Sequence, residues 1–314
     1  MSPIVSIIIC TRNRVGYLAG AIRSIYAQEV GKDFYETIVV DNASSDATQD
    51  FVRSRISRDS SLHYVFEPTI GLSCARNTGI RAARGHYLAF IDDDAITEAG
   101  WLEGILLALE ACGPDVGCLG GKVTPIWHAP RPGWLHDELI GFIGAFDPSP
   151  KPCWLDDHHD LYGCNVVYKK EALLRVGGFS TELGRKGNLL LSNEDVLLHR
   201  QLKRLGYCSY YDPCISIRHH VFATQMTKSW FRKRAYWQGV SDALLERQLE
   251  TWTFLKMTAK GLLRIGSLAK VPREMLALVD RGDDPVAFLR ACRVIWKLGY
   301  GFAALHSLLP VTPI

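Results

Sequence analysis

The sequence predicts an α/β fold with a largely parallel sheet. Three observations support this prediction: strand-like and helix-like segments alternate through the first half, each predicted strand is a short apolar run, and polar residues follow several strands directly. The 314 residues are enough for one large domain with an appendage or for two modest domains. In open α/β sheets, ligands bind outside the carboxyl ends of the strands, so these polar residues mark the expected site.

Four pairs of strand and helix signals follow one another in the first 112 residues. The apolar run PIVSIIICT, residues 3–11, predicts a buried strand, and Leu18, Ile22 and Ile25 recur at helical spacing in the next segment. The same reasoning predicts strands at 35–41, 62–68 and 85–91 and helices at 18–28, 48–56, 73–83 and 101–112. The polar stretches expected to share one crevice are 11–14, 41–45 and 92–94.

The second half departs from this alternation. Residues 120–160 are rich in proline and tryptophan, which predicts a loop-rich stretch. Its tryptophans, Trp127 among them, suit the flat face of a sugar or a lipid, or they simply pack within the loops. A strand and a helix are then predicted within 161–179, a helix within 192–207 and strand-like segments within 208–221.

From about residue 224 the segments are basic and amphipathic, without strand signals. We therefore predict two domains, at residues 1–223 and 224–314. The C-terminal helices could bind an anionic membrane surface, where a lipid-linked acceptor would be met, or pack on the first domain or on a second subunit. No stretch reaches 18 uncharged apolar residues, so we expect no transmembrane helix.

Composition narrows the classes of partner and compartment. Lys and Arg number 36 against 33 for Asp and Glu, so no overall basic field argues for nucleic acid as a partner. The nine cysteines are odd in number and form no CxxC pair, which predicts reduced thiols in a cytoplasmic protein. The chain runs straight into a predicted strand without a secretion leader, so secretion is not expected.

Three adjacent carboxylates end the fourth predicted strand, in the stretch FIDDDA. Strand alternation separates Asp92 and Asp94 from Asp93, so the first and third are predicted to face one crevice. Mg²⁺ and Mn²⁺ prefer hard oxygen ligands and are often held by one or two carboxylates plus substrate phosphates. We therefore expect a divalent cation, rather than a protein side chain, to stabilise these charges. The alternative is a solvated turn that caps the next helix.

A second acidic motif lies in SNEDVLLHRQL. Ser192 and Asp195 have the spacing of a capping box, which by itself predicts only the start of a helix. If Glu194 or Asp195 also faces the crevice, it can take a proton from a substrate hydroxyl. The two histidines of IRHHV follow the last strand-like segment, and one of His219 and His220 could be a further metal ligand or both could be structural.

Taken in order, these motifs resemble the inverting glycosyltransferases of family 2, which have the GT-A fold. The resemblance rests on VSIIICTRNR, IVVDNASSD, GLSCARNTGIRAARGHYLAFIDDDA, GCNVVYKKEALLRVGGF and NEDVLLHRQLKRLGY, and it covers roughly residues 4–222. It implies a Rossmann-like, mostly parallel sheet flanked by helices. It also implies a nucleotide-sugar donor, a Mn²⁺ or Mg²⁺ cofactor and a single displacement that inverts the anomeric carbon.

The resemblance also implies roles by position. The implied donor-binding residues are Thr11, Arg12, Asn13, Asp41, Ala43, Ser44, Arg76, Asn77, Asp92 and Asp93. Asp94 of the DXD-type motif would be the direct metal ligand, with Asp92 near the metal or the ribose. In relatives with a histidine after the last strand that residue can join the metal, which points to His219 or His220.

The remaining implied roles concern the acceptor. Asp195 matches the usual general base and Glu194 would support it, while Trp127, Gly163 and Asn165 are placed on the acceptor side. The donor would be a UDP-, GDP- or dTDP-sugar and the acceptor a glycan or a lipid-linked molecule. The protein would be cytoplasmic or peripheral on the inner face of the cell membrane, and a homodimer is a further option.

One motif departs from the family's commonest form. The first strand ends CTRNR where Pro-Thr-Tyr-Asn is commonest, so Arg12 replaces an aromatic side chain and can instead meet a phosphate or a carboxylate. Two alternatives stay open. A sugar nucleotidyltransferase would need a glycine-rich basic loop after the first strand, which CTRNRVGY lacks. A non-catalytic carbohydrate-binding protein of the same fold would need neither acidic motif.

Overall fold

The computed structural model describes residues 2–56, 59–113, 115–156, 159–250, 254–270 and 282–306. Its two compact units are a sheet unit, Met1–Ile126, Gly144–Thr181 and Glu194–His220, and a helical unit, Trp127–Ile143, Glu182–Asn193 and Val221–Ile314. The helical unit therefore includes two segments that precede the predicted boundary, which itself stays a prediction. All nine cysteines are free, as predicted.

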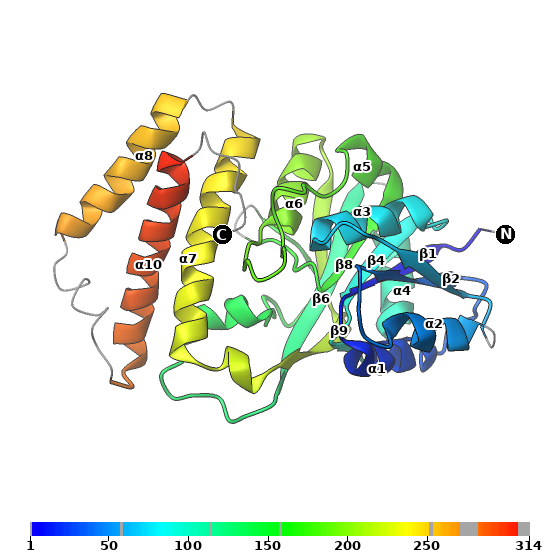
Figure 1. The fold of residues 1–314 in the computed structure, drawn as a ribbon. Helices are drawn as coiled ribbons and strands as arrows, with labels where there is room; N and C mark the ends of the chain where they lie inside the picture. Colours follow the sequence, from blue (N-terminus) through cyan, green and yellow to red (C-terminus); the bar gives the residue numbers. More distant parts are fainter. Residues whose placement is uncertain are drawn as a thin grey trace. The chain divides into compact units, whose positions relative to one another are not determined.

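Among the described residues, nine strands form one sheet in the order β3-β2-β1-β4-β8-β6-β9-β5, with β7 paired to β9. Figure 1 labels β1, β2, β4, β6, β8 and β9 of this sheet. They are β1 (Val5–Thr11), β2 (Tyr35–Asp41), β3 (Leu62–Phe66), β4 (Tyr87–Asp92), β5 (Ala95–Thr97), β6 (Val116–Trp127), β7 (Cys153–Trp154), β8 (Asn165–Lys169) and β9 (Cys208–Val221). The α/β class is confirmed, and β3, β2, β1 and β4 are parallel. The sheet is nevertheless mixed rather than mostly parallel, because β8 is antiparallel to β4 and β6, and β5 and β7 are antiparallel to β9.

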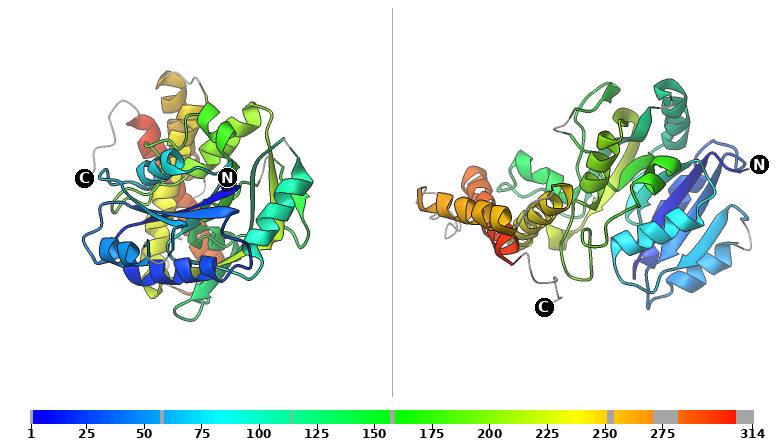
Figure 2. Two further views of the ribbon diagram at one scale, coloured as in Figure 1. Left: turned by 90° about the vertical axis from the view of Figure 1, so that its right-hand side faces the viewer. Right: turned by 90° about the horizontal axis from the view of Figure 1, so that it is seen from above.

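Alternating strand residues bury the two faces of the sheet against different helices. Ile7 and Ile9 of β1 belong to the cluster with α1, α2 and α4, whereas Ile8 belongs to the cluster with α3, α5 and α6. These helices are α1 (Val15–Tyr26), α2 (Thr48–Ile56), α3 (Leu72–Ala82), α4 (Trp101–Cys112), α5 (Lys170–Arg175) and α6 (Glu194–Arg204). Figure 2 shows α1 and α2, in blue, on one side of the first strands and α3, in cyan, on the other. Covered on both faces, this part of the sheet presents its polar loops at the strand ends.

Strand β6 lies where the sequence predicts loops from residue 120 onwards, so that expectation is wrong for residues 120–127. The glycines of β6 allow neighbouring backbone to approach closely. A Cβ at Gly121 would lie 1.9 Å from the carbonyl oxygen of Ile215, and one at Gly120 would lie 2.5 Å from that of Asn165. These glycines are needed for packing within the sheet and do not form a turn. Because glycine in a sequence usually indicates a turn or loop, the strand is not recognised from the sequence.

Among its described residues, the helical unit has the long helices α7, α8 and α10, and α10 packs against both α7 and α8 (yellow to red in Figure 1). Its elements are α7 (Lys228–Leu249), α8 (Phe254–Gly266), α10 (Pro285–Leu305) and the 3₁₀ helices η1 (Asp137–Ile143), η2 (Ala223–Gln225) and η3 (Ser267–Lys270). Glycines bring α7 and α10 together: a Cβ at Gly239 would lie 2.0 Å from the Trp296 carbonyl oxygen, and one at Gly299 would lie 2.1 Å from that of Tyr236. Within the described ranges, no helix is long and apolar enough to span a membrane.

Glu36 gives the sheet unit a pH-dependent contribution to stability. It is 2% exposed and accepts hydrogen bonds from Ser6 Oγ (2.6 Å), the Arg84 backbone N–H (2.6 Å) and Arg84 Nε (2.7 Å). Burial alone would raise the pKa of Glu36, but these hydrogen bonds outweigh it and hold the pKa below its ordinary value. The stabilisation is therefore complete above the ordinary carboxyl pKa and is lost as the pH falls through the folded value.

We expect Glu36→Gln to lower the free energy of unfolding by roughly 1–3 kcal/mol at neutral pH, because an amide cannot accept all three bonds. Urea unfolding of both proteins at about pH 7 and at about pH 3 measures this, and the difference between them should shrink at the lower pH. An equal difference at both pH values would contradict the assignment.

Candidate active site

The carboxyl ends of β1, β2 and β4 meet at one edge of the sheet. Thr11 ends β1 opposite Asp41, the last residue of β2, and Cys10 lies opposite Asp92 at the end of β4. This register brings together the polar stretches that follow the three strands, where the α/β rule places a ligand.

The loops after β1 and β2 hold each other in strained conformations. Asn13 and Ala43 both have φ of 56°, in the left-handed region that few residues other than glycine adopt. The backbone N–H of Asn13 donates to Ser44 Oγ (3.0 Å), and the side-chain oxygen of Asn13 accepts from the backbone N–H of Ser45 (2.7 Å). Arg12, beside Asn13, is exposed. Residues held in this way are concentrated at active sites and ligand clamps.

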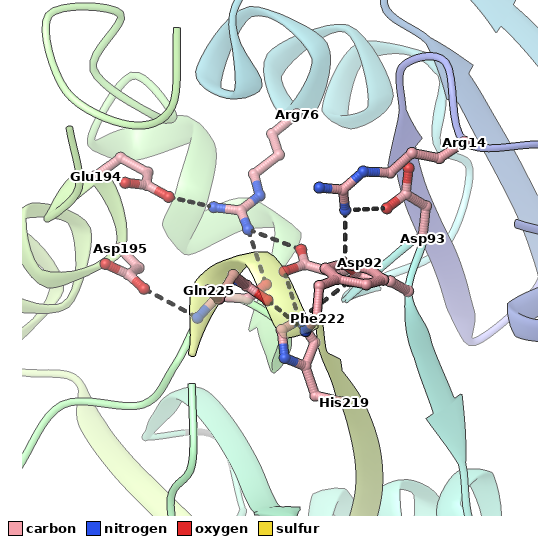
Figure 3. A network of polar contacts seen from close by, with 11 residues as sticks. Arg14, Arg76, Asp92, Asp93, Glu194, Asp195, His219, Phe222 and Gln225 are labelled. Carbon is pink, nitrogen blue, oxygen red and sulfur yellow. Dashed lines mark hydrogen bonds and ion pairs between the residues drawn. The ribbon is translucent and has the colours of Figure 1, made fainter. Parts of the chain in front are cut away.

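Asp92, Asp94 and His219 form a cluster suited to a metal ion. One ligand atom from each lies within 4.8 Å of the other two. His219 Nε2 lies 3.0 Å from Asp94 Oδ1. It lies 3.8 Å from Asp92 Oδ2, and Figure 3 shows the His219 ring beside Asp92. Strand pairing produces this arrangement, because His219 of β9 is paired with Ala95, the first residue of β5, directly after the aspartates.

Arg14 supplies a positive charge to the aspartates that the sequence analysis does not assign. Its Nη1 lies 2.6 Å from Asp94 Oδ2 and 3.2 Å from Asp93 Oδ1, and Thr11 Oγ1 donates to Asp93 Oδ2 (2.7 Å). The expectation that no protein side chain stabilises these carboxylates is therefore wrong, since Arg14 and His219 both pair with Asp94. The signal is the position of Arg14, in the loop directly after the first predicted strand.

Burial and charge act in opposite directions within this cluster. Burial, reinforced by the charge of Asp94, raises the pKa of Asp93 to about 7. Burial also disfavours ionised Asp94, but the hydrogen bond and charge of His219 and the charge of Arg14 hold the pKa of Asp94 below its ordinary value. Burial lowers the pKa of His219, whereas its bond to Asp94 and the charges of Asp94 and Asp92 raise it above the ordinary value. Both shifts favour an ion pair between Asp94 and His219.

Arg76 joins the aspartates to the second acidic motif (Figure 3). It is 3% exposed, with Nη1 2.8 Å from Glu194 Oε1 and Nη2 3.5 Å from Asp92 Oδ1. Nη2 also donates to the carbonyl oxygen of Gly163 (2.9 Å). Burial lowers the pKa of Arg76, but the charges of Glu194 and Asp92 raise it above its ordinary value, so Arg76 is a permanent cation. Its contacts hold neighbouring protein groups, and its predicted contact with the donor stays a prediction.

Asp195 lies beside Glu194 in the first turn of α6. Its Oδ2 accepts from the backbone N–H of Gly163 (2.9 Å) and its Oδ1 from that of Val196 (2.8 Å). Gly163 thus contacts Arg76 through its carbonyl and Asp195 through its N–H. A Cβ at Gly163 would lie 2.8 Å from Arg76 Nη2, so this position accommodates only glycine without displacing the arginine. Continuous polar contacts therefore connect the two acidic motifs.

The capping box predicted for Ser192 and Asp195 is not the arrangement found. Ser192 Oγ instead donates to Gln238 Oε1 (3.1 Å) and contacts Asn193 Oδ1 (3.4 Å). The helix begins at Glu194, after Asn193 with φ of 72°. A capping box needs an extended residue at the helix start, and the left-handed turn at Asn193 replaces it.

Asp41 and Asn77 bind other parts of the protein at positions where donor contacts are predicted. Asp41 accepts from the backbone N–H of Ser44 (2.9 Å) and from the Tyr64 hydroxyl (2.8 Å). The side-chain amide of Asn77 bonds to both backbone groups of Phe179, at 2.8 Å and 2.9 Å. Both residues thus shape the loops around the site, and their donor contacts stay predictions.

The assignment of Asn165 to the acceptor side needs correction. Asn165 is 1% exposed, its Oδ1 accepts from Trp101 Nε1 (2.9 Å), and its Nδ2 donates to the Ile215 carbonyl (2.7 Å). A side chain enclosed in this way cannot contact an acceptor. It pins β8 to β9 and α4 instead, a role that the sequence motif alone does not distinguish from binding.

His220 and Trp127 lie in surroundings different from that of His219. The ring of His220 makes an edge contact with Tyr17, with 5.2 Å between ring centroids. Successive strand residues face opposite sides, so His219 rather than His220 lies with the aspartates. Trp127 ends β6 and packs against the apolar core of the helical unit, and its acceptor role stays a prediction.

Residues 6–177, which include the loops after β1, β2 and β4, match the profile of the family described as glycosyl transferase family 2. The chain belongs to glycosyltransferase family 2. The two relatives described next are glycosyltransferases by name, which favours neither the nucleotidyltransferase alternative nor the non-catalytic one.

Relatives and solved structures extend the similarity beyond the matched segment. A glucosyl-dolichyl phosphate glucuronosyltransferase of Haloferax volcanii is 28% identical over 247 residues, which are 77% of this chain and 77% of the relative. A pre-mycofactocin glycosyltransferase of Mycobacterium tuberculosis is 26% identical over 94% of this chain and 65% of its own length.

Two solved structures share the fold. The mannosyltransferase PcManGT from Pyrobaculum calidifontis, in complex with GDP-Man and Mn²⁺, has a TM-score of 0.58 at 22% identity and covers 100% of this chain and 77% of its own. GalNAc-T7 with UDP, GalNAc and Mn²⁺ has a TM-score of 0.56 at 13% identity and covers 77% of this chain and 51% of its own. These likenesses confirm the predicted GT-A fold of this family 2 glycosyltransferase.

Proposed function

We propose that this family 2 glycosyltransferase moves a sugar from a nucleoside-diphosphate donor to a hydroxyl of a glycan or lipid-linked acceptor, with inversion at the anomeric carbon. The observation that carries the proposal is the pair of acidic motifs linked through Arg76 and Gly163. Glycosyl transfer requires stabilisation of a departing diphosphate at one point and removal of a proton from the attacking hydroxyl at another. Two separate but connected carboxylate groups match that division of labour.

The ligand set supports a divalent metal at the first motif. Asp92, Asp94 and His219 offer two carboxylate oxygens and an imidazole nitrogen within 4.8 Å of one another, a set compatible with Mn²⁺ and, with fewer protein ligands, Mg²⁺. A bound cation would neutralise charge that develops on the diphosphate leaving group. Arg14, whose side chain is 45% exposed, is placed to add a further positive charge to that region.

Asp195 is the proposed general base. Asp195 lies in the first turn of α6, where the helix dipole favours negative charge, and its carboxylate accepts from the backbone N–H groups of Val196 and Gly163. The acceptor hydroxyl would deliver its proton to a carboxylate oxygen of Asp195 as its own oxygen attacks the anomeric carbon. Glu194 neutralises Arg76 and so keeps the cation from pairing with the base.

The relatives guide the choice of substrates. One solved neighbour binds GDP-Man and the other UDP with GalNAc, so nucleoside-diphosphate sugars are the donors to test, dTDP-sugars included. The relative named for glucosyl-dolichyl phosphate supports a lipid-linked acceptor.

The stereochemistry of the product tests the reaction class. The enzyme is expected to convert an α-linked nucleotide sugar into a β-linked product, because one displacement by the hydroxyl inverts the reacting carbon. Proton NMR of the product, or of the sugar released by slow hydrolysis of the donor, reads the anomeric configuration directly. A product that retains the donor's configuration would contradict a single displacement with Asp195 as base.

We further propose that α8 contacts an anionic membrane surface from the cytoplasmic side. Leu262 and Leu263 on this helix are 56% and 74% exposed. The helix has no acidic residue, and its basic residues are Lys256, which is exposed, and Lys260 and Arg264, which pair with Glu246 of α7. Exposed leucines beside basic side chains suit the interface of an anionic bilayer. A lipid-linked acceptor would be met there. A second copy of the chain covering the same leucines is the alternative.

Flotation with anionic liposomes distinguishes these occupants. The double variant Leu262→Ser/Leu263→Ser is expected to float several-fold less than the wild type, because it loses the apolar contact while keeping every charge. Leu107→Ser/Leu174→Ser is the matched control, since these leucines of the sheet unit are 59% and 58% exposed. Equal flotation of all three proteins, with a change in oligomeric size for the α8 variant alone, would favour the second copy.

A further inference from the structure

A half-buried carboxylate in the helical unit accepts hydrogen bonds from three side chains. Asp242 of α7 accepts at Oδ1 from Asn193 Nδ2 (2.7 Å) and Gln238 Nε2 (2.8 Å), and at Oδ2 from Trp296 Nε1 (2.6 Å). Burial raises the pKa of Asp242 above its ordinary value, and these donors act against that rise. Because donors face both oxygens, an amide at this position would have to turn its own N–H₂ towards at least one of them.

The same face of α7 holds the two residues that precede α6. Ser241 Oγ accepts from the backbone N–H of Ser192 (3.0 Å), and Gln238 Nε2 donates to Asn193 Oδ1 (3.0 Å). Gln238, Ser241 and Asp242 are spaced i, i+3 and i+4, so they lie side by side on the helix. One turn of α7 is therefore hydrogen-bonded to both Ser192 and Asn193.

The turn at Ser192 and Asn193 is strained and directly precedes the proposed base. Asn193 has φ of 72° and is buried, and the next two residues are Glu194 and Asp195. A non-glycine residue keeps a left-handed conformation only where its surroundings hold it. Here both polar atoms of the Asn193 side chain are hydrogen-bonded: Nδ2 donates to Asp242 and Oδ1 accepts from Gln238. These bonds hold the left-handed conformation of Asn193, the residue that directly precedes α6.

We propose that Asp242 is a positioning residue for transfer, which acts through Asn193 to fix the turn that carries Asp195. The inference rests on the proposed function, because it needs Asp195 or its neighbour on the turn to take part in the reaction. It gives the C-terminal helices a role in catalysis in addition to any contact with a membrane. Even a half-buried carboxylate is a costly way to pack two helices, since apolar residues of similar volume often pack more stably. A requirement for hydrogen-bonded geometry at Asn193 accounts for it.

The test compares Asp242→Asn with a matched acid one turn further along α7. Glu246 is also partly buried and accepts from the Tyr300 hydroxyl (2.6 Å), but its side-chain partners Tyr300, Lys260 and Arg264 lie in α8 and α10. Asp242→Asn is expected to lower kcat by about 10-fold or more while the donor dissociation constant changes less than about twofold, since small misplacements of a reacting group have effects of this size. Glu246→Gln should lower the melting temperature about as much as Asp242→Asn does, but it should keep kcat within about twofold of the wild type. Equal kcat in both variants would overturn the inference.

Asn193→Ala keeps the inference testable if Asp242→Asn folds poorly, because it leaves the carboxylate its bonds to Gln238 and Trp296. It should reproduce the loss of kcat at unchanged donor affinity, and wild-type turnover in this variant would overturn the inference.

The double variant Asp195→Asn/Asp242→Asn separates the role of Asp195 as base from the positioning role of Asp242. If Asp242 acts through Asp195, the second substitution costs less than about twofold in the Asp195→Asn background. Fully additive losses would overturn the inference. Wild-type turnover in Asp195→Asn, with a slow Asp242→Asn, would instead remove Asp195 as base and keep the positioning of the turn.

Discussion

Replacement of Asp195 by Asn is expected to lower kcat by roughly 10²–10⁴-fold, the usual contribution of a general base. The amide is nearly the same size as the carboxylate, and its oxygen can still accept from the Gly163 N–H. It has no basic oxygen with which to take the acceptor's proton. Steady-state kinetics with saturating donor measure the change.

Donor binding in the same variant should stay within about twofold of the wild type, because the aspartate and histidine cluster is untouched. Asp50→Asn is a matched control, since Asp50 also lies in the first turn of a helix, α2, but is exposed. Turnover within twofold of the wild type in Asp195→Asn would remove this residue from the mechanism.

Asp94→Asn is expected to have the second large effect, a loss of about 10²-fold or more in kcat together with loss of stimulation by Mn²⁺. Asp94 is buried between Arg14 and His219 and contributes one ligand atom to the cluster. Its neighbour Asp93 is the natural comparison. Asp93 is equally buried and also meets Arg14, but its other partner is Thr11.

The contrast between the two aspartates carries the prediction. Asp93→Asn should keep the dependence of kcat on Mn²⁺ concentration, because Asp93 is not among the three clustered ligands. Asp94→Asn should abolish it. Kinetics across a Mn²⁺ titration measure both variants, and identical metal dependence in the two would contradict the assignment of Asp94 as ligand.

The sequence predicts the part of this fold that follows from periodicity and strand ends. Strands β1 to β4 and their helices lie close to their predicted ranges, because short apolar runs and helical spacing are local signals. The meeting of Thr11, Asp41 and Asp92 at one edge follows from parallel pairing alone. The antiparallel half of the sheet is harder to predict. The glycines of β6 are needed because carbonyl groups of β8 and β9, distant in the sequence, approach them closely.

The candidate site shows the same division. The motif FIDDDA points to the aspartates, although β4 ends at Asp92 and the next two residues form a turn rather than continuing the strand. The position of His219 beside them depends on the pairing of β5 with β9, and β5 has too few residues to be recognised from its pattern. Asn165 shows the opposite failure, because a polar residue in a motif can be either a ligand or a buried structural amide.

The role of Arg76 also could not be predicted from the sequence, because it depends on tertiary contacts. A buried arginine next to an asparagine in GLSCARNTG suggests a donor contact by position, yet the structure surrounds its guanidinium with Glu194, Asp92 and the Gly163 carbonyl. These partners come from three segments that are far apart in the sequence. Only their convergence shows that the two acidic motifs are connected.

Calorimetric titration of nucleoside diphosphates and their sugars, with and without Mn²⁺, tests the central claim most directly. We predict that at least one nucleoside diphosphate binds the wild-type protein about tenfold or more tightly with Mn²⁺ present, a difference of about 1.4 kcal/mol, and that Asp94→Asn loses this gain. If every nucleotide binds the wild type equally well with and without the metal, the cluster of Asp92, Asp94 and His219 is not a metal site for the donor.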